Sequence, residues 1–215
     1  MNHQTKISVK TVVRYIRDFS IVVAGIAVTL YVNEQVTNRN EKRNLKLYLS
    51  TIKLEMENNL GNIEWQINIL QKSIGYTNYL NSNDKQSLHP DTIKSYNCDG
   101  GYYYYASFEY KQTAFEMFKI SGVMRFMDNR NLLHDIWNVY NGLSGLKEGV
   151  YEYNHMKLEE IKKEILTSEK KDKDFIPMYN FYTIPVTSML VQSYDDQREF
   201  LEEVIEWLEK ELSNK

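Results

Sequence analysis

One apolar run near the start of the chain restricts the possible folds more than any other feature. Residues Phe19–Asn33 carry no charged side chain over 15 positions. As a helix this run is about 22 Å long, shorter than the roughly 30 Å hydrocarbon core of a bilayer. Extending the helix back to Val12 supplies the missing length, because basic side chains at its start can reach the headgroups. We therefore predict a transmembrane helix at 12–36 after an N-terminal tail at 1–11.

Two other interpretations of the run stay open. A cleaved signal peptide has the same basic start and apolar centre, but small residues suited to cleavage are poorly placed after Leu30 and Tyr31. A helix buried in a soluble core, or in a homo-oligomer, is also compatible with such a short run.

The charges around the run barely distinguish its two orientations. Four basic residues precede it and four follow it: Lys6, Lys10, Arg14, Arg17, Arg39, Lys42, Arg43 and Lys46. Because an N-terminal signal anchor commonly leaves its short basic end in the cytoplasm, we expect the C-terminal part outside the inner membrane.

Small and polar residues on this helix form a candidate membrane or oligomer interface. Ser20 and Ala24, like Gly25 and Thr29, lie four residues apart, a spacing that lets helices pack closely in lipid. Asp18 costs free energy at the edge of the run unless it reaches water, pairs with Arg14 or Arg17, or lies in an assembly. The candidate interface comprises Asp18, Ser20, Ala24, Gly25, Thr29 and Asn33.

The remainder of the chain has the composition of a folded helical protein. The whole chain contains 9 Gly and 3 Pro in 215 residues, so helix breakers are few. The net charge of −3 predicts no strong attraction to nucleic acid. The single cysteine, Cys98, excludes an internal disulfide framework and a multi-cysteine zinc site.

A heptad-like stripe predicts that the first helix continues from the membrane to about residue 80. Its apolar residues are spaced by three and four: Leu45, Leu49, Ile52, Met56, Leu60, Ile63, Ile67, Leu70 and Ile74. Polar residues, among them Lys53, Glu55, Glu57 and Gln66, are expected on the other face. Trp65 lies off the stripe and indicates a second contact.

A Tyr-rich loop at 81–107 is expected next. Asn81–Asn97 is rich in turn formers, and Gly100 and Gly101 precede the run Tyr102–Tyr105. Adjacent tyrosines suit a surface for sugar or peptide, but we favour aromatic packing of the loop against a bundle.

Three further helices follow in the expected order. A short one covers Phe108–Ile120 and ends at Ser121-Gly122, since glycine suits a left-handed cap. A second long helix begins near Asp128 or Asn129, and three glycines on it predict close approach to a neighbouring helix, or a kink: Gly142, Gly145 and Gly149. Residues Phe175–Val191 form a buried irregular segment or a short helix after Pro185. Ser193 and Asp196 then match a capping signal that starts the last helix.

Two patches resemble an uncharacterised family of small bacterial single-pass membrane proteins. The first patch is an acidic residue, an apolar helix with Gly-Ile inside, and a polar exit: Asp18, Val22, Val23, Gly25, Ile26, Leu30, Asn33, Asn40, Glu41, Lys42 and Arg43. The second is an aromatic short helix ending in Ser-Gly and the helix after it: Phe115, Phe118, Ser121, Gly122, Met124, Phe126, Leu132, Ile136 and Tyr140. The family usually has Glu in place of Asp18 and a Trp in the exit. The resemblance implies a membrane-anchored helical protein and no particular reaction.

Few residues form a pattern that carries chemistry. His155 and Glu159, four apart, suit a surface pair better than a metal site, and Glu109 and Glu116 match chance spacing among 29 acids. We therefore predict no catalytic, cofactor-binding or metal-binding residues, and no cofactor.

Taken together, the patterns predict an all-α protein. A transmembrane helix continues into a long helix, which packs with a second long helix and a C-terminal helix in a bundle domain at 37–215. The expected function is a non-enzymatic scaffold, assembly or sensor-like subunit. Its partners would be the bilayer and either its own copies or another membrane protein, with no nucleic acid and no small-molecule substrate. A soluble or peripheral homo-oligomer, and an enzyme with an unrecognised site, are the alternatives.

Overall fold

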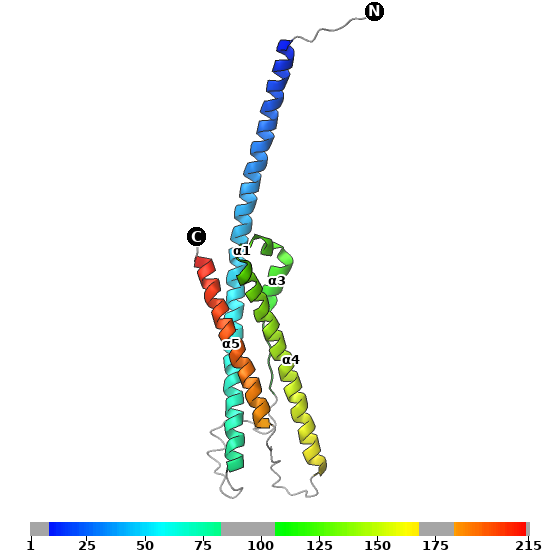
Figure 1. The fold of residues 1–215 in the computed structure, drawn as a ribbon, viewed down its shortest axis with the longest axis vertical. Helices are drawn as coiled ribbons and strands as arrows, with labels where there is room; N and C mark the ends of the chain where they lie inside the picture. Colours follow the sequence, from blue (N-terminus) through cyan, green and yellow to red (C-terminus); the bar gives the residue numbers. More distant parts are fainter. Residues whose placement is uncertain (1–8, 83–105, 168–182, 214–215) are drawn as a thin grey trace, which may run out of the picture. The chain divides into compact units, whose positions relative to one another are not determined.

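The computed structural model describes residues 9–82, 106–167 and 183–213. Over these ranges the chain is helical apart from short connections, and it contains no strand, which confirms the all-α prediction. The elements in chain order (Figure 1) are α1 Val9–Ser82, α3 Thr113–Ser121, the 3₁₀ helix η3 Val123–Phe126, α4 Arg130–Thr167 and α5 Thr183–Ser213.

The chain divides into two compact units, Met1–Leu47 and Tyr48–Lys215. Helix α1 contributes to both of them, because the division falls inside it. In the first unit α1 carries the apolar run. The second unit contains the remainder of α1 and all later elements, and it forms the bundle.

Within the second unit, α1 and α4 run parallel while α5 runs antiparallel to both. Lys53, early in this part of α1, pairs with Glu209 near the end of α5 at 3.0 Å. Gln197 of α5 donates to the Val139 carbonyl early in α4, whereas Thr187, near the start of α5, bonds Tyr153 late in α4. Figure 1 shows α4 and α5 lying side by side. Because α1 and α4 are parallel, the chain must return between them, and residues 106–112, which belong to no helix, are part of that return before α3 and η3.

The predicted α1 stripe forms one wall of the core. Six of its side chains in this unit are at most 6% exposed: Leu49, Ile52, Met56, Ile63, Ile67 and Leu70. Leu60 and Ile74 are half-buried. The fully buried apolar side chains of α3, α4 and α5 include Phe118, Ile136, Val139, Leu143, Leu201, Val204 and Leu208. Burial of each such side chain contributes about 1.5–3 kcal/mol, so this stripe positions α1 in the bundle.

The helix predicted at Phe108–Ile120 begins five residues later than expected, at Thr113. Ala106 and Phe108 are buried, and the backbone there is extended because side-chain amides of other elements bond it, as described below. The end of the helix was predicted correctly, since Gly122 follows α3 with a left-handed φ of 71°. The start of α4 is also confirmed: Asn129 Oδ1 accepts a bond from the Leu132 N–H at 3.1 Å, the geometry of an N-cap.

The predicted start of the last helix at Ser193 is wrong, because α5 already begins at Thr183. Pro185 lies in the first turn of α5, where its missing N–H would have no partner inside the helix. Ser193 Oγ donates to the Met189 carbonyl at 3.0 Å, and Asp196 accepts from Gln192 at 2.7 Å. These two residues are therefore interior helix positions and cap nothing.

Two assignments on α1 are also corrected. Glu55 and Gln66 were expected on the polar face but are 8% and 3% exposed. Trp65 is 58% exposed, so the described residues provide no substantial second contact for it. The predictions for Tyr102–Tyr105, for Cys98 and for 175–182 concern positions outside the described ranges.

Candidate functional site

The six residues of the predicted membrane or oligomer interface all lie on α1 and are exposed. At 100° per residue, Asp18, Gly25, Thr29 and Asn33 share an arc of about 80°. Ser20 and Ala24 lie on roughly the opposite side of the helix. Helix geometry therefore separates the six into two faces, and one close-packed contact cannot use both small-residue pairs at once.

The polar groups on these two faces already have partners within the helix. Ser20 Oγ donates to the Ile16 carbonyl, and Thr29 Oγ1 donates to the Gly25 carbonyl, each at 2.8 Å. Such back-bonding satisfies a hydroxyl that has no water to bond. Asp18 pairs with Arg17 at 3.2 Å, which is one of the two predicted pairings.

The apolar part of α1 is exposed along its whole length. Among the described residues, α1 is the one helix long and apolar enough to cross a membrane, and 0% of its apolar window is buried by the chain itself. The exposed side chains are large: Phe19 is 71%, Ile21 64% and Leu30 63% exposed. Something other than the described residues must therefore cover them if they are to leave water.

The second unit contains a buried polar cluster that the sequence did not indicate. The Glu55 carboxylate of α1 accepts bonds from the Ala114 N–H at 2.8 Å and the Phe115 N–H at 3.3 Å. Those are the second and third residues of α3, whose N-cap residue Gln112 makes no side-chain cap bond. Glu55 therefore caps the N-terminus of α3 although it belongs to a different helix. Its negative charge also interacts favourably with the positive end of the α3 dipole.

Tyr140 of α4 completes this cluster. Its hydroxyl donates to Glu55 at 2.6 Å, and its ring stacks on Phe115 with centroids 4.2 Å apart. Burial raises the pKa of the Tyr140 hydroxyl well above its ordinary value of 10.0, and the adjacent Glu55 carboxylate raises it further. Three elements are thus joined at one carboxylate: α1, α3 and α4.

Side-chain amides hold the returning segment 106–112 in the same way. Asn59 of α1 accepts from the Lys111 N–H at 2.8 Å and donates to the Lys111 carbonyl at 2.7 Å. Asn154 of α4 makes the equivalent pair with Ala106, at 3.0 Å and 2.7 Å. Each asparagine imitates the hydrogen bonds that a neighbouring strand would provide.

Two further residues extend this arrangement along α1. Asn62 donates to the Glu109 carbonyl at 3.3 Å, and Gln66 donates to the Ser107 carbonyl. Glu55 and the three amide residues of α1 are spaced by four, three and four: Glu55, Asn59, Asn62 and Gln66. The three amides donate to the carbonyls of alternate residues of the segment: 111, 109 and 107. We call Glu55, Asn59, Asn62, Gln66 and Asn154 the polar ladder. It matches the helical period of α1 to the period of two of an extended chain.

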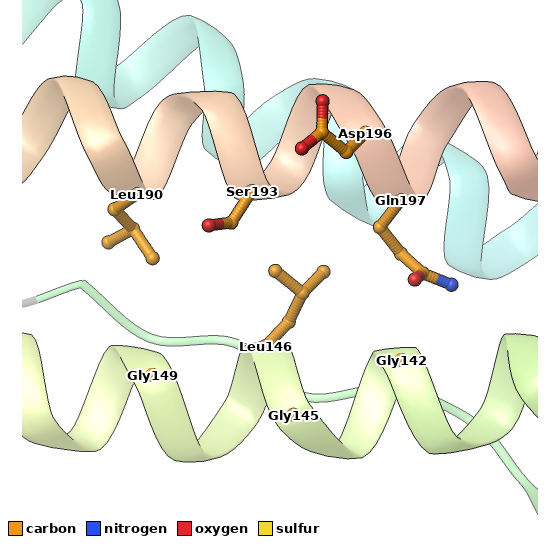
Figure 2. A pocket seen from close by; sticks show the side chains of 8 residues that line it. All are labelled: Gly142, Gly145, Leu146, Gly149, Leu190, Ser193, Asp196 and Gln197. Carbon is orange, nitrogen blue, oxygen red and sulfur yellow. The ribbon is translucent and has the colours of Figure 1, made fainter.

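A shallow groove of about 370 Å³ lies between α4 and α5. The predicted glycines Gly142, Gly145 and Gly149 line its α4 side (Figure 2). Figure 2 shows Leu146 and Leu190 pointing toward one another across it, whereas Asp196 points away from α4. Close approach is confirmed at Gly142, where an added Cβ would overlap the Gln197 amide, but Gly145 and Gly149 have nothing within 4 Å of such an atom.

The other acids and histidines considered from the sequence are in separate places on the surface. Glu109 pairs with Lys147 and Glu116 with Lys119, each at 2.6 Å. Glu159 pairs with Lys162 at 2.7 Å rather than with His155. Within the described ranges, no group of three or more His, Cys, Asp or Glu side chains is placed to hold a metal ion.

The described residues define a class of protein, an all-α bundle with one helix long and apolar enough to cross a membrane. No protein-family model, curated protein or solved structure matches the chain. The family resemblance at Asp18–Asn33 and Phe115–Tyr140 therefore stays a prediction.

Proposed function

We propose that the chain is a single-pass protein of a bacterial inner membrane, anchored by α1, and that its bundle is a non-enzymatic interaction module. It would act as a scaffold, an assembly subunit or a sensor-like subunit. The observation that carries the proposal is the complete exposure of the apolar window of α1. Leaving about ten large apolar side chains in water costs on the order of 10 kcal/mol, and a bilayer removes that cost.

The polar ladder supports a non-enzymatic bundle. Its buried side chains Glu55, Asn59 and Gln66 bond backbone groups of the segment 107–115, so they are used in holding the fold. Catalytic groups need a free position next to a substrate, and a buried carboxylate that accepts three bonds from its own chain provides none.

For the orientation, we propose that the short N-terminus is cytoplasmic and the bundle lies outside. The four basic residues before the run must then stay inside, although four others follow it.

Extraction of the full-length protein from membranes tests the anchor. We expect the wild type to resist alkaline carbonate and to be released only by detergent. Ile26→Lys places a charge in the span, at a cost of about 2.5–3.5 kcal/mol on the insertion scale, so a large fraction should become extractable by carbonate.

Leu54→Lys is the matched control, because Leu54 and Ile26 have similar exposures of 59% and 55% but Leu54 lies in the bundle unit. It should extract like the wild type. Release of the wild type by carbonate would contradict the anchor. If the released protein then sedimented as an oligomer, α1 would be covered by other copies of the chain instead of lipid.

A further inference from the structure

The polar exit of α1 carries its basic residues on one side of the helix. Arg39, Lys42, Arg43 and Lys46 are all exposed on α1. At 100° per residue they fall within an arc of about 100°. We call these four residues the basic face.

The acidic residues of the same stretch lie on the other side. Glu34 and Glu41 are about 130° and 150° from the centre of the basic face, on the helix geometry used above. The charges of this stretch are therefore sorted around the helix as well as along it.

The basic face also lies at the right depth for lipid headgroups. The rise per residue puts Arg39 about 10 Å and Lys46 about 21 Å beyond Val32, near the end of the apolar run. The headgroup region adds roughly 5–8 Å to each side of the hydrocarbon core, and surface charge acts over about 8 Å more at physiological salt. Arg39 falls within this zone directly and Lys42 lies at its edge, about 15 Å beyond Val32. The long flexible side chains of Arg43 and Lys46 can reach back toward it.

We infer that the basic face binds anionic phospholipid headgroups of the bilayer that α1 crosses. The inference rests on the proposed anchor, and it adds a lipid class as partner. Phosphate oxygens are the natural acceptors for Arg and Lys, and each basic residue near an anionic surface attracts it measurably. The whole chain has a net charge of −3, so general attraction to polyanions is not expected.

Lipid selectivity of the full-length protein tests the inference. The protein is reconstituted in phosphatidylcholine bilayers, and spin-labelled phosphatidylglycerol and spin-labelled phosphatidylcholine are compared for the fraction held in the motionally restricted shell around α1. We expect phosphatidylglycerol to be preferred about fivefold, and the preference to decline in high salt. The variant Arg39→Gln/Lys42→Gln/Arg43→Gln/Lys46→Gln should lower it by about half, because the four basic residues before the run remain.

A control variant removes the same four charges from exposed positions of the bundle: Lys72→Gln, Lys111→Gln, Arg130→Gln and Lys210→Gln. It should keep the preference of the wild type. Equal fractions of both lipids in the shell of the wild type would overturn the inference while leaving the anchor intact. Loss of the preference for phosphatidylglycerol in the control variant would also overturn it. Absence of any restricted lipid would instead overturn the anchor itself.

Discussion

At the scale of single residues, Glu55 shows how one buried charge can be stabilised without a counter-ion. Its carboxylate accepts two backbone N–H groups at the start of α3 and the Tyr140 hydroxyl. Hydrogen bonds to a charged group contribute about 1.5–3 kcal/mol each, which offsets the desolvation of a side chain only 8% exposed. Tyr140 is the member of this group whose contribution can be isolated by pH.

Tyr140→Phe should change how stability depends on alkaline pH. The pKa of Tyr140 is raised in the folded protein above its ordinary value of 10.0, so the folded state keeps a proton that the unfolded state releases. The free energy of unfolding should therefore fall above about pH 10, by about 1.4 kcal/mol per pH unit for this group, and that part should be absent in the variant. Urea unfolding in detergent between pH 8 and 11.5 measures the difference.

Below pH 9 the curves of the wild type and of Tyr140→Phe should run parallel, offset by the lost bond to Glu55. The buried Tyr153, whose pKa burial also raises, is present in both proteins and cancels in the comparison. Identical slopes above pH 10 would mean that Tyr140 is not held protonated by burial.

The glycines of α4 give a second prediction at this scale. An added Cβ at Gly145 meets nothing within 4 Å, so Gly145→Ala should stabilise the helix by up to about 1 kcal/mol. At Gly142 the same atom displaces the Gln197 amide, which donates to the Val139 carbonyl at 3.1 Å. Loss of that bond, about 0.5–1.5 kcal/mol, should cancel the gain. Urea midpoints would distinguish the two variants, and equal midpoints would contradict the close approach at Gly142.

At the scale of elements, the central feature is a return segment without a strand partner. Only Ala106 and Phe108 of this segment are buried, and α1 and α4 bond its peptide groups through side chains in place of a neighbouring strand. The polar ladder therefore lets α1 and α4 pack as parallel neighbours with backbone between them. It also explains why Glu55, Asn59 and Gln66 are buried beside an apolar stripe.

Local patterns predicted the elements that depend on local chemistry. The three-and-four spacing of the α1 stripe, the Asn129 cap and the left-handed Gly122 each act within a few residues along the chain. The polar ladder could not be read in this way, because Asn59 and its partner Lys111 are 52 residues apart and asparagine on a helix ordinarily faces water. The same holds for α3, since the Glu55 cap that starts it comes from another helix.

Asn59→Ala tests the polar ladder. It removes both bonds to Lys111 and leaves a peptide N–H and a carbonyl without their partner, so we expect a loss of about 2–3 kcal/mol in the free energy of unfolding. Amide exchange at Lys111 should become faster by on the order of tenfold or more.

The adjacent residue provides the control. Asn58 is exposed and donates only to the Leu54 carbonyl of its own helix at 2.7 Å. Asn58→Ala should change stability by about 0.5 kcal/mol or less, since alanine also favours the helix. Similar losses of stability in both variants would show that the bonds of Asn59 to Lys111 stabilise the fold no more than the bond of Asn58 within its own helix.

At the scale of the whole molecule, one helix has two parts with different surroundings: its apolar run is exposed, and its later stripe is buried in the bundle. The division at Leu47 and Tyr48 lies inside α1, so no loop marks it in the sequence. The apolar run and the buried stripe differ in the charged residues between their apolar positions. Residues 19–33 contain no charged side chain, whereas the bundle part of α1 alternates apolar and polar positions. Composition therefore distinguishes the two parts of a continuous helix, although charged residues already begin at Glu34, before the division at Leu47 and Tyr48.

The orientation of the whole chain can be decided with a reporter fused after Lys215. An enzyme reporter that is active only outside the inner membrane should be active on the wild type. Arg14→Gln/Arg17→Gln leaves two basic residues before the run against four after it, so part of the population should invert and reporter activity should fall. Arg39→Gln/Lys42→Gln reverses that imbalance and should keep the activity of the wild type or raise it. An inactive reporter on the wild type would place the bundle in the cytoplasm, and equal activities of the two variants would mean that these charges do not orient α1.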